Sequence, residues 1–146
     1  MPDRVEVIQE MFVNAVGPKM TDDQKNELIE LINNDSLSKH ELNVKIKELC
    51  KESGDEVMKK YSDIINTFVL NETKILKKLK NVGDRFTPET RVLLQDATKV
   101  YTNQSISYRK ESEQLQDLFD NATTEIKAEL KLFGEPFTYI SRNFNN

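Results

Sequence analysis

Hydrophobic residues recur every three or four positions along almost the whole chain, and the strict alternation typical of a half-buried strand is hard to find. This spacing gathers the apolar side chains of each segment on one face of a helix. The first such segment runs from about residue 4 to residue 16, with Val5, Ile8, Phe12 and Val16 on its apolar face. The pattern therefore predicts an all-α fold.

Turn and capping residues divide this pattern into six to seven helices. Gly17 and Pro18 end the first helix, and Thr21 with Gln24 has the spacing of a capping box that begins the second. Gly54 has the backbone freedom needed to close the third. The later helices are expected to begin near Ser38, Asp55, Thr87, Ser107 and Ala122.

The fourth helix, from about Asp55 to Lys80, is the longest and would span about 39 Å. We expect it to be the central helix of a compact bundle. The fifth helix is expected to direct one group of apolar residues inward, namely Val92, Leu93, Ala97, Val100 and Tyr101.

The chain of 146 residues fits one domain, residues 1–146, with a core over about residues 4–133. No linker, low-complexity segment or internal repeat is evident. The tail, residues 135–146, carries Phe137, Ile140 and Phe144 at helical spacing. Because free tails rarely carry large apolar residues in register, we expect this tail to dock on the domain.

The charge balance argues against nucleic acid as a partner. The 25 acidic and 21 basic residues give a net charge of −4, whereas nucleic-acid-binding proteins usually carry a basic excess. The densest basic group, Lys74, Lys77, Lys78 and Lys80, is interpreted as a solvated helix face. No apolar run approaches the roughly 20 residues needed to cross a bilayer, so no transmembrane segment is predicted.

The residue types needed for catalysis are scarce, and we predict that the protein is not an enzyme. His40 is the single histidine and is expected on the surface, and the single cysteine, Cys50, lies on an apolar helix face. Glycines are too scattered for a phosphate-binding loop, and one Cys with one His supplies too few ligands for a typical zinc site. No catalytic or cofactor-binding residue is assigned, and no cofactor is required.

Hard cations need only oxygen ligands, so weak binding of Mg²⁺ or Ca²⁺ stays open. The local acidic groups are Asp22–Asp23, Asp55–Glu56 and the pair Asp117 and Asp120, all at or near helix ends. Complementation of the helix dipole or a solvated face is the favoured interpretation of each group. The metal ligands therefore stay unassigned.

Four segments carry a resemblance to a known family. These are the turn and helix start around Phe86–Thr90, followed by Asn103–Ser107 and Glu125–Leu130, and, in the first half, Lys19–Gln24. They resemble the nematode SXP/RAL family, whose domain is described as cation-binding and which includes an anisakid allergen. The resemblance implies a secreted, all-helical worm protein that binds Mg²⁺ or Ca²⁺ and is exposed to the host immune system.

The leading hypothesis is a secreted, non-enzymatic binding protein of this type, with a divalent cation, a small lipid or a host protein as partner. Asn34, Asn103 and Asn121 begin N-x-[ST] sequons at predicted helix ends, where glycosylation is feasible in a secreted protein. The start at Met1 fits either a mature chain without its signal peptide or a native cytoplasmic start. The alternative is accordingly an intracellular protein–protein interaction or scaffold module.

Overall fold

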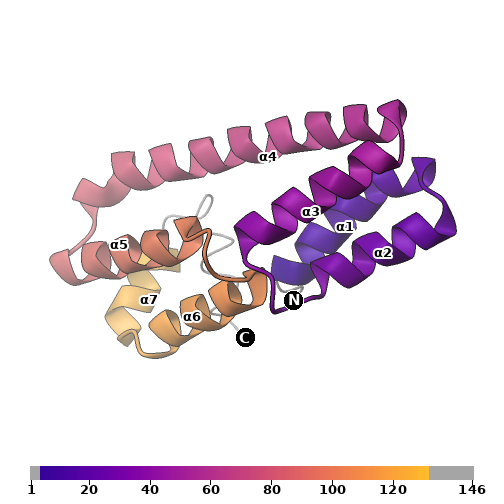
Figure 1. Ribbon diagram of the computed structural model, residues 1–146. Coiled ribbons are helices and arrows are strands. Elements are labelled where there is room, and N and C mark those ends of the chain that lie inside the picture. The colour runs from indigo at the N-terminus through magenta and orange to yellow at the C-terminus, as the bar shows by residue number, and fades with distance from the viewer. Residues whose placement is uncertain (1–3, 132–146) are drawn as a thin grey trace. The chain divides into compact units, whose positions relative to one another are not determined.

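The computed structural model describes residues 4–131, and within them the predicted all-α fold is confirmed (Figure 1). The elements are α1 (Arg4–Val16), the short 3₁₀ helix η1 (Gly17–Lys19), α2 (Asp22–Ile32), α3 (Lys39–Glu52), α4 (Asp55–Val82), the 3₁₀ helix η2 (Gly83–Arg85), α5 (Pro88–Thr102), α6 (Tyr108–Asp120) and α7 (Thr124–Lys131). The long fourth helix is also confirmed, with 28 residues.

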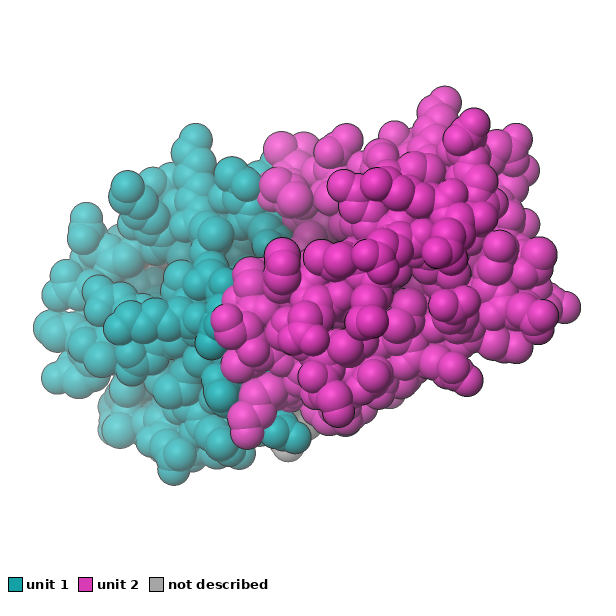
Figure 2. All heavy atoms as spheres, in the orientation of Figure 1, with its two compact units in different colours: residues 1, 71–103, 111–146 teal, residues 2–70, 104–110 magenta. Residues whose placement is uncertain are grey.

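The chain folds into two compact units, which share α4 and α6 along the sequence (Figure 2). Of the described residues, unit 1 holds 71–103 and 111–131, and unit 2 holds 4–70 and 104–110. The prediction of a single domain over residues 1–146 stays a prediction, and each unit is described by itself.

Unit 2 has a core built from the apolar faces that the sequence predicted. Ile8 and Phe12 of α1 are almost fully buried, as are Leu28 of α2 and Ile46 of α3. These side chains belong to one hydrophobic cluster, to which α4 adds Val57 and Tyr61. Since each helix buries a single stripe, helical periodicity was sufficient to find this core.

Unit 1 has a smaller core, and here one prediction is wrong. Leu94 and Ala97 of α5 are buried with Leu115 and Phe119 of α6, whereas Val92 is 56% exposed. The inward face of α5 follows Thr90, Leu94, Ala97 and Tyr101, at steps of three and four residues. Val92 lies two residues from Leu94, on the other side of the helix, and the core selects Leu94 instead.

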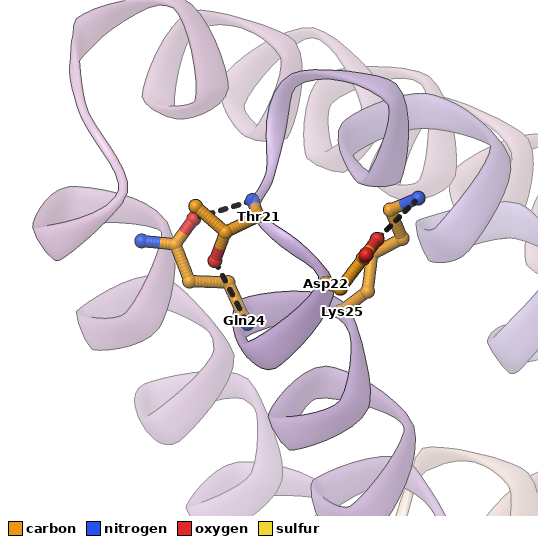
Figure 3. A network of polar contacts seen from close by, with 4 residues as sticks. All are labelled: Thr21, Asp22, Gln24 and Lys25. Carbon is orange, nitrogen blue, oxygen red and sulfur yellow. Dashed lines mark hydrogen bonds and ion pairs between the residues drawn. The ribbon is translucent and has the colours of Figure 1, made fainter.

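Side-chain caps fix where the helices begin. In the predicted capping box at α2, the Gln24 N–H donates to Thr21 Oγ1 (3.2 Å) and the Thr21 N–H donates to Gln24 Oε1 (3.0 Å) (Figure 3). Ser38 caps α3 by accepting from the Glu41 N–H. Gly54, between α3 and α4, has a φ of 111°, which confirms the left-handed conformation expected there.

The predicted docking of the tail, residues 135–146, falls outside the described residues. None of the helices that the structure describes combines the length and apolarity needed to span a bilayer.

Candidate functional site

A partly open groove in unit 1 is a candidate site for a small ligand. It has a volume of about 560 Å³, which is within the usual range for small-molecule sites. It is lined by the end of α4, by η2 and by one face of α5: Leu76, Leu79, Lys80, Gly83, Asp84, Arg91, Leu94, Gln95, Thr98 and Lys99. The steps of three and four residues along both helices explain why these side chains share one space.

The groove combines an apolar surface with cations. Leu76, Leu79 and Leu94 supply the apolar part, and Leu94 is itself 6% exposed. Three basic side chains against one carboxylate give the lining a positive balance: Lys80, Arg91 and Lys99 against Asp84. Among the described residues, none of these four forms an ion pair. The arrangement suits a molecule with an apolar chain and an anionic group.

The start of α5, which carries half of the groove, is held by a carboxylate from α7. Glu129 Oε1 accepts from the Thr87 N–H (2.7 Å), and Oε2 accepts from the hydroxyls of Thr87 (2.9 Å) and Thr90 (2.7 Å). Burial raises the pKa of Glu129, but these three hydrogen bonds lower it by more, and the net pKa falls below its usual 4.5. The ionised carboxylate therefore fixes the start of α5.

The two residues considered for nucleophilic chemistry lie in unit 2 and are not brought together with the groove. His40 is exposed at the start of α3, as predicted. Cys50 is fully buried in the core cluster of unit 2, and burial raises the pKa of its thiol from 9.0 to about 11. A thiol in this setting is a small apolar core residue at neutral pH.

The acidic groups singled out in the sequence are spread over separate helix ends. Asp22 and Asp23 lie in the first turn of α2, and Asp55 and Glu56 lie in that of α4, where carboxylates complement the helix dipole. Over residues 4–131, no three His, Cys, Asp or Glu side chains are grouped as ligands of a metal ion. Binding of Mg²⁺ or Ca²⁺ stays a prediction of the sequence.

Two buried cations of unit 2 were not foreseen. Lys39 is 1% exposed, and its Nζ lies 5.5 Å from the centroid of the Tyr108 ring. The Arg4 guanidinium lies 5.4 Å from the Phe68 centroid and 5.5 Å from that of Tyr108. These distances allow cation–π attraction, which offsets part of the cost of burying charge. We interpret the group as structural, because it is buried in the core of unit 2.

Comparisons with known proteins do not extend this description. No protein family matches the chain, and neither does a curated protein or a solved structure. The resemblance to the nematode SXP/RAL family therefore stays a prediction of the sequence.

Proposed function

We propose that the protein is a non-enzymatic binding protein whose groove in unit 1 takes an amphipathic anion of the fatty-acid class. The observation that supports this most is the lining itself, in which leucines meet three cations and one carboxylate. An alkyl chain would lie on Leu76, Leu79 and Leu94, and a carboxylate headgroup would lie among the basic side chains. Secretion and contact with a host belong to the same proposal, supported by the family resemblance and the sequons.

The chemistry of the groove predicts how the Kd should depend on the chain length and the headgroup of the ligand. Each methylene moved from water onto the leucines contributes about 0.8 kcal/mol, which corresponds to roughly a fourfold change in Kd per carbon. The charge of the headgroup should add a further preference, since charge-assisted hydrogen bonds are about twice as strong as neutral ones. A carboxylate should therefore bind more tightly than an alcohol of equal chain length.

The test is displacement of a fluorescent fatty acid by three twelve-carbon compounds. Dodecanoate should displace the probe at micromolar concentration, dodecanol more weakly, and dodecyltrimethylammonium least, because its cation meets Lys80, Arg91 and Lys99. Equal displacement by all three would show binding without use of the cations. Absence of probe binding at micromolar protein would refute the proposal.

A substitution that fills the groove supplies the matched control. A Cβ added at Gly83 would meet nothing within 4 Å, and the φ of Gly83 is not positive. Gly83→Leu should therefore fold normally and block the apolar part of the groove, while Gly83→Ala adds a single methyl group. We expect Gly83→Leu to abolish displacement and Gly83→Ala to retain most of it.

The alternative, an interaction or scaffold module, finds less support on the described surface. The large apolar residues exposed there are Val7, Val44, Val69, Leu70 and Val92, and of these Val69 and Leu70 are neighbours in the sequence. Single exposed apolar side chains are ordinary on soluble proteins, whereas a docking face needs a contiguous patch. We therefore base the proposed function on the groove in unit 1.

A further inference from the structure

The groove belongs to a segment that occurs twice in the chain. Residues 16–28 read VGPKMTDDQKNEL, and residues 82–94 read VGDRFTPETRVLL. Valine, glycine, threonine and leucine are identical at four corresponding positions. Four further positions keep their chemical type: Lys19 and Arg85, Met20 and Phe86, Asp23 and Glu89, and Lys25 and Arg91.

The two segments also fold alike. Each begins with a 3₁₀ turn closed by the same backbone hydrogen bond, from Met20 N–H to Gly17 O (3.0 Å) and from Phe86 N–H to Gly83 O (3.3 Å). A threonine then occupies the N-cap of the following helix in both.

The likeness continues beyond these helices. The loops read Asn-Asp-Ser-Leu-Ser at 34–38 and Asn-Gln-Ser-Ile-Ser at 103–107. The last serine of each loop caps the next helix, because Ser38 Oγ accepts from Glu41 N–H and Ser107 Oγ accepts from Lys110 N–H. We therefore treat residues 4–52 and 70–120 as two copies of one helix–turn–helix–loop–helix unit.

The copies differ at the place where the groove lies. In the first copy Gly17 is buried, and an added Cβ would lie 3.5 Å from Val13 Cγ1 and 3.6 Å from the stem of Lys25. The corresponding positions in the second copy are Leu79, Gly83 and Arg91, and all three line the groove. The space beside the glycine is therefore filled in the first copy and open in the second.

A second difference concerns the cation. Lys25 forms an ion pair with Asp22, with 3.8 Å between Nζ and Oδ1; Figure 3 draws this pair as a dashed line. The residue that corresponds to Asp22 in the second copy is Pro88, which offers Arg91 no carboxylate. Arg91, half-buried in the groove wall, forms no ion pair with any of the described residues.

We infer that Arg91 is the residue that binds the anionic headgroup of the ligand, in place of the carboxylate that pairs with its counterpart Lys25. This inference rests on the proposed function and names the headgroup contact within the same groove. Its basis is the paired difference between the copies: an enclosed glycine beside a paired cation in one, and an open glycine beside an unpaired cation in the other.

The test restores the missing carboxylate and removes the cation. Pro88→Asp places a carboxylate three residues before Arg91, as Asp22 stands before Lys25, and Pro88→Asn is its neutral control. We expect Pro88→Asp to raise the Kd for dodecanoate about threefold relative to Pro88→Asn, and Arg91→Met to raise it about tenfold. Pro88→Asp and Arg91→Met should both leave the Kd for dodecanol unchanged.

The outcomes separate this inference from the proposal beneath it. If the wild-type protein binds neither dodecanoate nor dodecanol, the proposed function fails, and the role of Arg91 falls with it. If the wild-type protein binds dodecanoate but Arg91→Met and Pro88→Asp leave that Kd unchanged, the inference about Arg91 alone is overturned. Equal losses for acid and alcohol would also overturn it, because they would indicate damage to the groove and no headgroup contact.

Discussion

Removal of the Glu129 carboxylate should lower the free energy of unfolding of unit 1, and the size of the loss follows from the hydrogen bonds that are removed. The Glu129→Ala substitution deletes three hydrogen bonds at the start of α5, from Thr87 N–H, Thr87 Oγ1 and Thr90 Oγ1. Each contributes about 0.5–1 kcal/mol net, after allowance for the partial exposure of the carboxylate. The expected loss is about 2 kcal/mol in the free energy of unfolding, or roughly 6–8 °C in Tm.

The pH dependence of this loss has a defined sign. The pKa of Glu129 is lowered in the folded chain from its usual 4.5, so the ionised carboxylate stabilises the fold fully above that value. Its contribution disappears as the pH falls through the folded-state pKa. The difference between the wild-type protein and Glu129→Gln, measured by urea unfolding, should therefore be largest at neutral pH and shrink below about pH 4.5.

A matched control removes a carboxylate that makes no contact with the start of α5. Glu113→Ala, at an exposed position of α6, is the control. A Glu129→Ala protein within 0.5 kcal/mol of the wild type would refute the reasoning (roughly the scatter of neutral surface changes).

Three further predictions follow from single sites. Gly17→Leu should lower stability by about 1–3 kcal/mol in thermal unfolding, because Val13 and Lys25 enclose Gly17. Gly54→Ala should lower it by about 1 kcal/mol because of the φ of 111°, with no steric clash to add to the loss. Cys50 should react with a disulfide reagent at pH 8 about a hundredfold more slowly in the folded than in the denatured chain, since burial raises its pKa to about 11; equal rates would show that the thiol is exposed.

Helix positions and most of the core followed from local rules. Periodicity found the buried faces of α1 and α3, and the spacing of Thr21 and Gln24 predicted a capping box that the structure contains. Such features depend on residues within one or two helical turns, which the sequence shows directly. The wrong orientation of Val92 has the opposite cause, because α5 offers several apolar residues and packing against α6 and α7 selects among them.

The groove could not be predicted from the sequence, since it is formed by side chains from separate elements. Lys80 belonged to a group interpreted as a solvated helix face, and Arg91 carried no signal of its own. The contact of Glu129 with Thr87 joins residues 42 positions apart. The repeated unit is not evident in the sequence because α2 has 11 residues and α5 has 15. The number of residues between the turn and the loop therefore differs between the two copies.

The most direct test of the account is a titration of the ¹⁵N-labelled protein with dodecanoate, followed by amide chemical shifts. Saturable changes should concentrate at residues 76–84 and 91–99, which line the groove, and should be lost in Gly83→Leu. Saturable changes confined to unit 2, or none at millimolar dodecanoate, would contradict the assignment of the groove as the binding site.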